Sequence, residues 1–506
     1  MEAQQQRSYT ATVVDETNQS IPFASVRLIK YGQGVITNAD GGFRIPVLDV
    51  FLRDTLVITC IGFKSRRLAI ASLDPLNPNI IRLQSSVVEL SPVEIRAADT
   101  RKLTGRRLVE RAINRIPYNY PQSQFGYIAY YRDYQIKDRQ YVNMNEALVQ
   151  VNDEGFSTND QLDTKIQLIE YKPNTAFPVD TIARQPYDNI ERKFIPHASL
   201  KNFSGNELAT LMVHDPLRNH GLFSFSFINR LDKDFLINHR FSMAGTLVED
   251  NRVLYIVSFI TTDNASGMEH QGRGKLFIEK GNYRIHKLQY STIEWQSHKP
   301  VPLYNVSVEY VNRGNLMYLN YISFNNEFKM RNEDDFKVLE VRQLADSAGF
   351  LVRFSHRPTE HTARNEANYN FRLNGKRIDL RKIVFTENRS TEPAFHMAVM
   401  AYVKDTIRFN EQLGNLAHHT ITADIKGIRD FKDREVNVMT FVGATQYREI
   451  FVQQHITDPS DSTKYPVIDK YTPLYKTPPP KESAHSNFWM NTPLIRRLED
   501  ADGISN

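Results

Sequence analysis

The histidines have the clearest capacity for chemistry in this chain, because imidazole binds metals and transfers protons near neutral pH. None of the 14 histidines is followed three positions later by Glu, so the His-x-x-Glu zinc pair of a metallocarboxypeptidase is absent. Two pairs remain, His418-His419 and His356 with His361. A spacing of five does not place two rings on one helical face, and adjacent side chains on a strand point to opposite faces. We therefore predict no metal site and no cofactor.

Motifs for nucleophilic catalysis and phosphate binding are also missing. The sequence contains neither Gly-x-Ser-x-Gly nor Gly-x-x-x-x-Gly-Lys-Ser/Thr. His214-Asp215 could form half of a catalytic dyad, but Pro216 directly after it is typical of a helix end. A short acidic cluster could perform glycoside chemistry if two carboxylates were held roughly 5–10 Å apart, although a solvated loop also explains it. We assign no catalytic residue; the cluster consists of Glu327, Glu333, Asp334 and Asp335.

Composition bounds the class of protein. The chain has 506 residues, of which 41% are hydrophobic and 24% charged, as in ordinary globular proteins of two or three domains. The net charge of +5 is small beside 63 basic and 58 acidic residues, so it gives no reason to expect a nucleic-acid partner. No window reaches the roughly 18–20 apolar residues of a membrane helix, so we predict no transmembrane segment.

The single cysteine, Cys60, cannot form an internal disulfide, and its apolar surroundings predict a buried side chain. A low cysteine content fits either a cytosolic protein or a periplasmic protein that is stabilised by a large core.

Residues 20–97 have the pattern of a small β-sandwich. The runs 26–30 and 55–59 are short and β-branched, and turn residues separate them. Between them, residues 38–42 combine Asn and Asp with two glycines, which tolerate a left-handed backbone. A calcium loop is the alternative interpretation of this segment, but the acidic pattern with its distal Glu is missing. We therefore predict a tight turn between antiparallel strands.

Several residues in this stretch are specific for a domain family as a set, although none of them is specific alone. They are Pro22, Ala24, Val26, Gly34, Thr37, Asp40, Gly41, Phe43 and Ile61-Gly62-Phe63. With this set, residues 8–97 resemble the carboxypeptidase regulatory-like domain, a seven-stranded prealbumin-like sandwich. The resemblance implies an accessory module rather than an enzyme. That family recurs at the N-termini of Gram-negative envelope proteins, so the resemblance also implies a periplasmic or outer-membrane-associated location.

The N-terminus lacks the basic and apolar segments of an export signal. Ala3 followed by Gln4-Gln5-Gln6 is what remains just past a cleavage point, so we expect that a signal has been removed.

Two helices are expected after the sandwich. Leu108, Ala112 and Ile116 repeat every four residues beside four arginines, and Pro117 ends the pattern, which predicts an amphipathic linker helix over 98–117. Ser204 with Glu207 three positions later has the spacing of a capping box and predicts the start of a second helix.

Residues 118–355 are expected to form a curved antiparallel β domain. Residues 304–310 alternate apolar and polar side chains, and runs of similar length lie at 253–260, 275–278, 283–290 and 316–324. This region weakly resembles the half-barrels of periplasmic lipoprotein carriers, whose concave face holds acyl chains. The strand 253–260 is apolar on both faces, which equally fits an ordinary core. If the sheet binds a ligand, the candidate lining residues are Tyr255, Phe259, Tyr304 and Tyr310.

The remaining residues, 356–506, are expected to form a mixed C-terminal region. Segments 377–385 and 434–442 have the pattern of strands, and 392–409 has the length of a helix. Residues 458–480 are rich in Pro, Asp, Ser and Thr, which predicts an extended arm. Phe488-Trp489-Met490 with Leu494-Ile495 would anchor that arm.

The sequence thus predicts a mainly β protein, with a prealbumin-like sandwich followed by a curved antiparallel domain and a few helices. Its predicted function is non-enzymatic binding or scaffolding in the cell envelope, with a lipid acyl chain or an envelope protein as partner. The alternative is a hydrolase of unfamiliar type that uses carboxylates of the β domain on glycan or peptide. The sequence does not indicate an oligomeric state.

Overall fold

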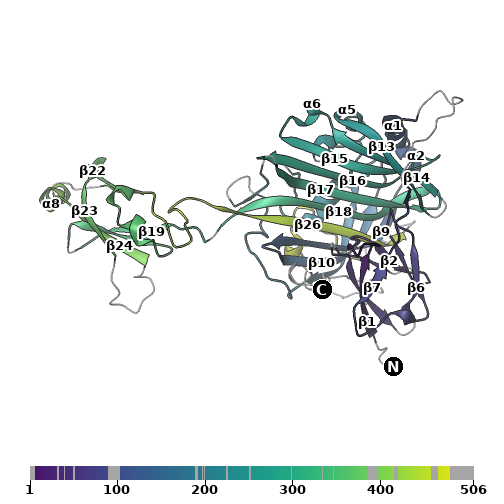
Figure 1. Ribbon diagram of the computed structural model, residues 1–506, viewed down its shortest axis with the longest axis horizontal. Coiled ribbons are helices and arrows are strands. Elements are labelled where there is room, and N and C mark those ends of the chain that lie inside the picture. Colours follow the sequence, from purple (N-terminus) through teal and green to yellow (C-terminus); the bar gives the residue numbers. More distant parts are fainter. Residues whose placement is uncertain are drawn as a thin grey trace. The chain divides into compact units, whose positions relative to one another are not determined.

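The computed structural model describes residues 6–30, 34–38, 40–48, 52–88, 103–187, 192–196, 198, 200–223, 226–249, 252–297, 299–332, 334–345, 347–385, 397–414, 420–456 and 465–478. The protein is mainly β, as expected, and nearly all strand pairs are antiparallel (Figure 1). Two compact units divide the chain. Unit 1 contains Met1–Lys329 and Gly443–Asn506, and unit 2 contains Met330–Val442.

The first strands of unit 1 form two small sheets with strand orders β4-β1-β7 and β3-β2-β5-β6. Alternation places Val26 and Leu28 of β2 in the core between them, whereas Arg27 points away. The predicted tight turn is confirmed: Gly41 has φ +75°, and its N–H donates to the carbonyl of Asn38 at 2.9 Å. The strands are β1 (Gln6–Val14), β2 (Ser25–Leu28), β3 (Gly34–Ile36), β4 (Gly42–Leu48), β5 (Thr55–Thr59), β6 (Arg66–Ala69) and β7 (Asn79–Arg82).

The rest of unit 1 is organised by one sheet of 12 strands, in the order β11-β10-β9-β26-β18-β17-β16-β15-β14-β13-β8, with β12 paired to β18. In Figure 1 the labelled long strands β26, β18, β17, β16 and β15 follow one another in that order. They are β8 (Val87–Val88), β9 (Phe125–Lys137), β10 (Gln140–Asp153), β11 (Lys165–Pro173), β12 (Lys193–Phe194), β13 (His239–Glu249), β14 (Arg252–Thr261), β15 (His270–Glu279), β16 (Ile285–Gln296), β17 (Lys299–Arg313), β18 (Leu316–Arg331) and β26 (Phe441–Ile456).

Helices cover one face of this sheet. The predicted amphipathic helix is present as α1 (Gly105–Asn114), capped by Thr104 and followed by α2 (Ile116–Asn119). The apolar side of α1 is buried in the core of the sheet. The other helices of unit 1 are α3 (Asp160–Asp163), α4 (Glu207–Val213), α5 (Phe235–Asn238) and α6 (Asp263–Ser266).

The predicted capping box at Ser204 is wrong. The cap of α4 is Asn206, whose side-chain oxygen accepts the N–H of Ala209, while Ser204 adopts a left-handed φ of 51°. Glu207 is at the first helical position and forms an ion pair with Arg448 at 2.5 Å. The helix starts where it does because Asn is as good a cap as Ser and Glu207 has a long-range partner.

Unit 2 is inserted between β18 and β26, which are neighbours in the large sheet. It contains the sheets β19-β20-β24-β23 and β22-β21-β25 around one apolar core. The boundary expected between residues 355 and 356 differs from the start of unit 2 at Met330. The sequence showed no boundary at 330, because its strand pattern continues through β19 and β20. The elements are β19 (Val338–Gln343), β20 (Gly349–Phe354), α7 (Glu360–Ala363), β21 (Tyr369–Leu373), β22 (Lys376–Ile378), β23 (Leu380–Phe385), β24 (Ala398–Val403), α8 (Thr406–Gly414) and β25 (Ile421–Ile425).

Two expectations for the C-terminal region need correction. The length of 392–409 predicted a helix, but this segment contains β24 and only the first residues of α8. The segment 434–442 is irregular until β26 begins at Phe441. Side chains there form hydrogen bonds instead of a strand ladder, as described below.

Part of the predicted C-terminal arm is described. Residues 465–478 run beside β11, where the N–H of Leu168 donates to the carbonyl of Pro466 and the N–H of Ile468 donates to Ile166. Ile468 and Leu474 are buried in the main core. The predicted anchor, Phe488-Trp489-Met490 with Leu494-Ile495, lies outside the described residues, as does His418-His419.

Candidate functional site

The candidate lining residues from the sequence lie on the two long strands β14 and β17. Phe259, Tyr304 and Tyr310 are each 3% exposed, and Tyr255 is half-buried. All four belong to the helix-covered face. The ring of Phe259 lies 4.9 Å from that of Phe235 on α5, so the chain's own helices occupy the space above these side chains.

A cluster of buried charges lies on the same face. Asp153 ends β10 and receives two hydrogen bonds from the Arg218 guanidinium, at 2.8 and 2.9 Å. Asp160, at the start of α3, contributes a second carboxylate to this cluster and accepts a hydrogen bond from Asn219. Burial raises the pKa of Asp153, and the hydrogen bonds from Arg218 oppose that rise.

Asp215 completes the cluster. Its carboxylate accepts a 2.6 Å hydrogen bond from the Tyr310 hydroxyl and also caps the N–H groups of Leu217 and Arg218. Burial raises the pKa of Asp215 to about 6. The cavity between these residues has a volume of about 20 Å³, close to what one water requires. The cluster can therefore hold a water and a proton, but it has no room for a glycan or a peptide.

The other residues considered for catalysis do not form a catalytic arrangement. The His214 ring stacks on Phe324, its Nδ1 contacts the carbonyl of Thr210, and burial lowers its pKa to about 3. Within the described part of the chain, no three His, Cys, Asp or Glu side chains are arranged to hold a metal ion. Cys60 is buried, as predicted, and burial raises the pKa of its thiol to about 11.

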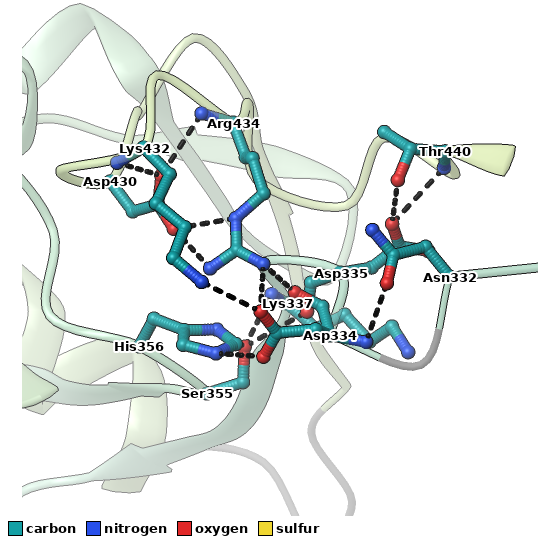
Figure 2. Close-up of polar contacts among 10 residues, drawn as sticks. All are labelled: Asn332, Asp334, Asp335, Lys337, Ser355, His356, Asp430, Lys432, Arg434 and Thr440. Atoms are coloured by element: carbon teal, nitrogen blue, oxygen red, sulfur yellow. Dashed lines mark hydrogen bonds and ion pairs between the residues drawn. The ribbon is translucent and has the colours of Figure 1, made fainter. Parts of the chain in front are cut away.

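The acidic residues of unit 2 belong to a structural network (Figure 2). The Asp334 carboxylate contacts Arg434 at 2.6 Å, His356 at 2.7 Å and Lys432 at 3.2 Å. These hydrogen bonds, led by that of Arg434, hold the pKa of Asp334 well below its usual value. Arg434 also pairs with the buried carboxylate of Asp430.

A second part of this network joins the two segments by which the chain enters and leaves unit 2. Asp335 accepts hydrogen bonds from the N–H and hydroxyl of Thr440, and the N–H of Asn332 donates to the carbonyl of Thr440. Figure 2 shows these residues at the ends of the two segments. Of the acids predicted as a solvated loop, Asp334 and Asp335 thus join these two segments of unit 2, Glu327 lies in β18, and Glu333 lies outside the described residues.

The face of the large sheet without helices carries the second candidate site. On this face, Arg132 of β9 and Glu449 of β26 form an ion pair at 2.5 Å, and both side chains are 0% exposed. The Arg132 guanidinium also donates to the side-chain oxygen of Asn38, from the small sandwich, at 2.5 Å. The sandwich is therefore docked on this face through a buried, charge-assisted contact.

Aromatic rings extend this contact. Phe23 of the sandwich stacks on Tyr321 of β18 at 5.2 Å, Tyr321 on Phe451 at 5.1 Å, and Phe451 on Tyr130 at 5.6 Å. Phe23 has a φ of +61°, a conformation that is costly for a bulky residue. Such strain persists where the surrounding packing compensates for it. At the other end of the interface, Ile61 packs against the apolar outer side chains of β13–β15.

Between these two apolar contacts lies a cavity of about 430 Å³. Its sandwich wall consists of side chains from β2 and β5 that alternate away from the sandwich core, followed by Cys60 and Ile61. The large sheet supplies the facing wall from β13, β14 and β16–β18. Charged groups on this wall include Glu309, Arg313 and Arg252.

The sequence did not indicate these interface residues as a site. Arg27 lies between Val26 and Leu28, a pattern that predicts a strand residue facing water. Arg132 follows two tyrosines, and this position also predicts a side chain that faces water. The one available signal is a pair of adjacent charged residues beside aromatic and aliphatic ones, at Arg132-Asp133 and Arg448-Glu449. It does not reveal which partner, 317 residues away, is involved.

Comparisons with known proteins concern parts of the chain. No curated protein matches it. Similar solved structures include a DUF1329 family protein from Desulfovibrio piger, with a TM-score of 0.21, and a putative outer membrane lipoprotein-sorting protein domain from Vibrio parahaemolyticus, with a TM-score of 0.19. Each is 9% identical to this chain, and each match covers 44% of this chain and 85% of the other. No helix in the described residues is long and apolar enough to cross a membrane.

The N-terminal part has a family assignment. The model of the CarboxypepD_reg-like domain family matches residues 9–95, which contain most of β1 and all of β2–β7 of the small sandwich. This match confirms the resemblance found in the sequence. Residues 9–95 form a carboxypeptidase regulatory-like domain.

Proposed function

We propose that this protein is a non-enzymatic binding or scaffolding protein of the bacterial cell envelope, located in the periplasm or at the outer membrane. The observation that carries the proposal is the docking of the carboxypeptidase regulatory-like domain on the large sheet. A buried hydrogen bond from Arg132 to Asn38 and an aromatic stack hold the two together, and they leave a cavity of about 430 Å³ between them. That volume is within the roughly 300–1,000 Å³ of small-molecule sites.

The envelope location is supported by the domain at residues 9–95, since its family implies an accessory module of envelope proteins. The ligand class we propose is a lipid or an envelope protein. An acyl chain on the helix-covered face, beside Phe259, Tyr304 and Tyr310, would have to displace α4 or the segment 465–476, because these pack into the same core. A ligand in the interface cavity requires no such displacement.

The hydrolase alternative requires two close carboxylates that a substrate can reach. The buried cluster of Asp153, Asp160 and Asp215 satisfies the first requirement, but its cavity of about 20 Å³ does not satisfy the second. We therefore favour binding over hydrolysis.

Native mass spectrometry of the full chain, purified gently from its own host, tests the proposal. We expect a stoichiometric adduct, either a lipid or a second protein, that is lost under denaturing conditions. A spectrum containing only the bare chain, from preparations made both with and without detergent, would refute the binding function.

A further inference from the structure

The interface cavity has an excess of positive charge. Arg27 projects into it from β2 and is half-buried, and Arg313 lies on the facing strand β17. Glu309 is bound to Lys287 at 2.6 Å, and His286 contacts Glu279 at 3.2 Å. Glu249 also lines the cavity. Arg252 lines the same cavity.

Arg27 is held in place by neutral acceptors. Its Nη2 donates to the Asn320 side-chain oxygen at 3.1 Å and to the Val452 carbonyl at 2.9 Å. Within the described residues, neither Arg27 nor Arg313 forms an ion pair with a carboxylate. Burial and the nearby charge of Arg313 lower the pKa of Arg27 to about 10, because both disfavour the charged form of its guanidinium. A guanidinium fork fixed by neutral oxygens is prepared to receive an anion.

The cavity also has an apolar part. Val57 and Ile61 of the domain, and Val311 of β17, contribute aliphatic surface beside the arginines. A ligand that matches both parts carries one oxyanion and an aliphatic body, and it is small enough for about 430 Å³.

We propose that the cavity between the carboxypeptidase regulatory-like domain and the large sheet binds an amphipathic small molecule, whose phosphate or carboxylate is held by Arg27 and Arg313. This inference rests on the proposed binding function and names its site and ligand chemistry. The anion lies against the two guanidinium groups, and the aliphatic body lies along Val57, Ile61 and Val311.

Isothermal titration of the full chain with octyl phosphate, octanoate, octanol and inorganic phosphate tests this site. We expect one octyl phosphate or octanoate per chain, bound at least about tenfold more tightly than octanol, because an Arg–oxyanion contact contributes more than a neutral one. Inorganic phosphate should bind more weakly than octyl phosphate; equal binding would show that the aliphatic body contributes nothing and would overturn the amphipathic ligand. Equal affinity for octanol and octyl phosphate would overturn the proposal.

Variants locate the site. Arg27→Met is expected to weaken octyl phosphate binding at least about tenfold, and Arg27→Lys, which keeps the charge, less than that. Arg313→Gln changes an exposed side chain, so it tests the site even if Arg27→Met fails to fold; we expect about a threefold or greater loss. The matched control is Arg240→Gln on β13, an exposed arginine outside the cavity, which should bind normally.

Undiminished binding by Arg313→Gln and Arg27→Lys would refute the site. If a lipid or protein adduct is nevertheless found by native mass spectrometry, the proposed function stands and only the location of its ligand is wrong. If that adduct is absent but octyl phosphate binds tightly and its binding depends on Arg313, the site is correct and the proposed function is wrong.

Discussion

Glu449→Leu is expected to destabilise unit 1 by about 3–5 kcal/mol, because it leaves the fully buried guanidinium of Arg132 without its carboxylate. Leu has nearly the volume of Glu, so the loss reports the missing charge rather than a cavity. Urea unfolding, followed by fluorescence and circular dichroism, measures the change.

The double variant Arg132→Met/Glu449→Leu is the informative companion. Replacing both members of a buried ion pair with apolar side chains is often nearly neutral, so we expect the double variant to recover most of the stability lost by Glu449→Leu. As a control, Arg240→Gln breaks an exposed ion pair and should change the free energy of unfolding by less than about 1 kcal/mol. A double variant less stable than Glu449→Leu would contradict our interpretation of the pair.

Arg218→Met is expected to cost about 3–5 kcal/mol at pH 8, because it leaves the buried Asp153 without its ion-pair partner and removes the nearby positive charge from Asp160. The loss should decrease as the pH falls. Burial already raises the pKa of Asp153, and removal of Arg218 raises it further above the value of about 3.9 in the unfolded chain. Between these two pKa values the folded state binds more protons than the unfolded state, so stability increases as the pH falls through the folded pKa.

Urea unfolding at pH 5 and pH 8 measures this effect. The loss of stability at the two pH values should differ by about 1.4 kcal/mol for each unit by which the pKa of Asp153 in the folded state exceeds 5, with 8 as the upper limit. In Asp153→Asn/Arg218→Met, the amide cannot ionise, so the difference between the two pH values should become much smaller. An identical loss for Arg218→Met at pH 5 and pH 8 would show that Asp153 does not take up the proton.

Features that depend on neighbouring residues could be predicted from the sequence. The turn at residues 38–42 was predicted because Asn, Asp and Gly tolerate a left-handed backbone, and Gly41 supplies the positive φ. The buried face of α1 was predicted because its apolar residues recur at helical spacing, which is also a feature of neighbouring residues. The cap of α4 was misplaced because Ser204 and Asn206 are both good caps. The choice between them involves Glu207, whose partner Arg448 is 241 residues away.

The candidate site could not be predicted, because it exists only where two sheets meet. Arg27 has the pattern of a residue facing water, and only the docking of the domain places it opposite Arg313. The aromatic candidates Tyr304 and Tyr310 were found because alternation identifies a buried face, and Phe259 because it lies in a strand that is apolar on both faces. Alternation does not say whether a ligand or the chain's own helices cover that face.

The docking of the carboxypeptidase regulatory-like domain on the large sheet is the claim on which the function and the site both depend. A double-mutant cycle between Asn38 and Arg132 tests it most directly, since their side chains meet across the interface at 2.5 Å. From the unfolding free energies of Asn38→Ala, Arg132→Met and the double variant, we predict a coupling energy of about 1.5–3 kcal/mol, as for a hydrogen bond to a charged group. A coupling energy of zero within error would show that the domain and the sheet do not make this contact in solution.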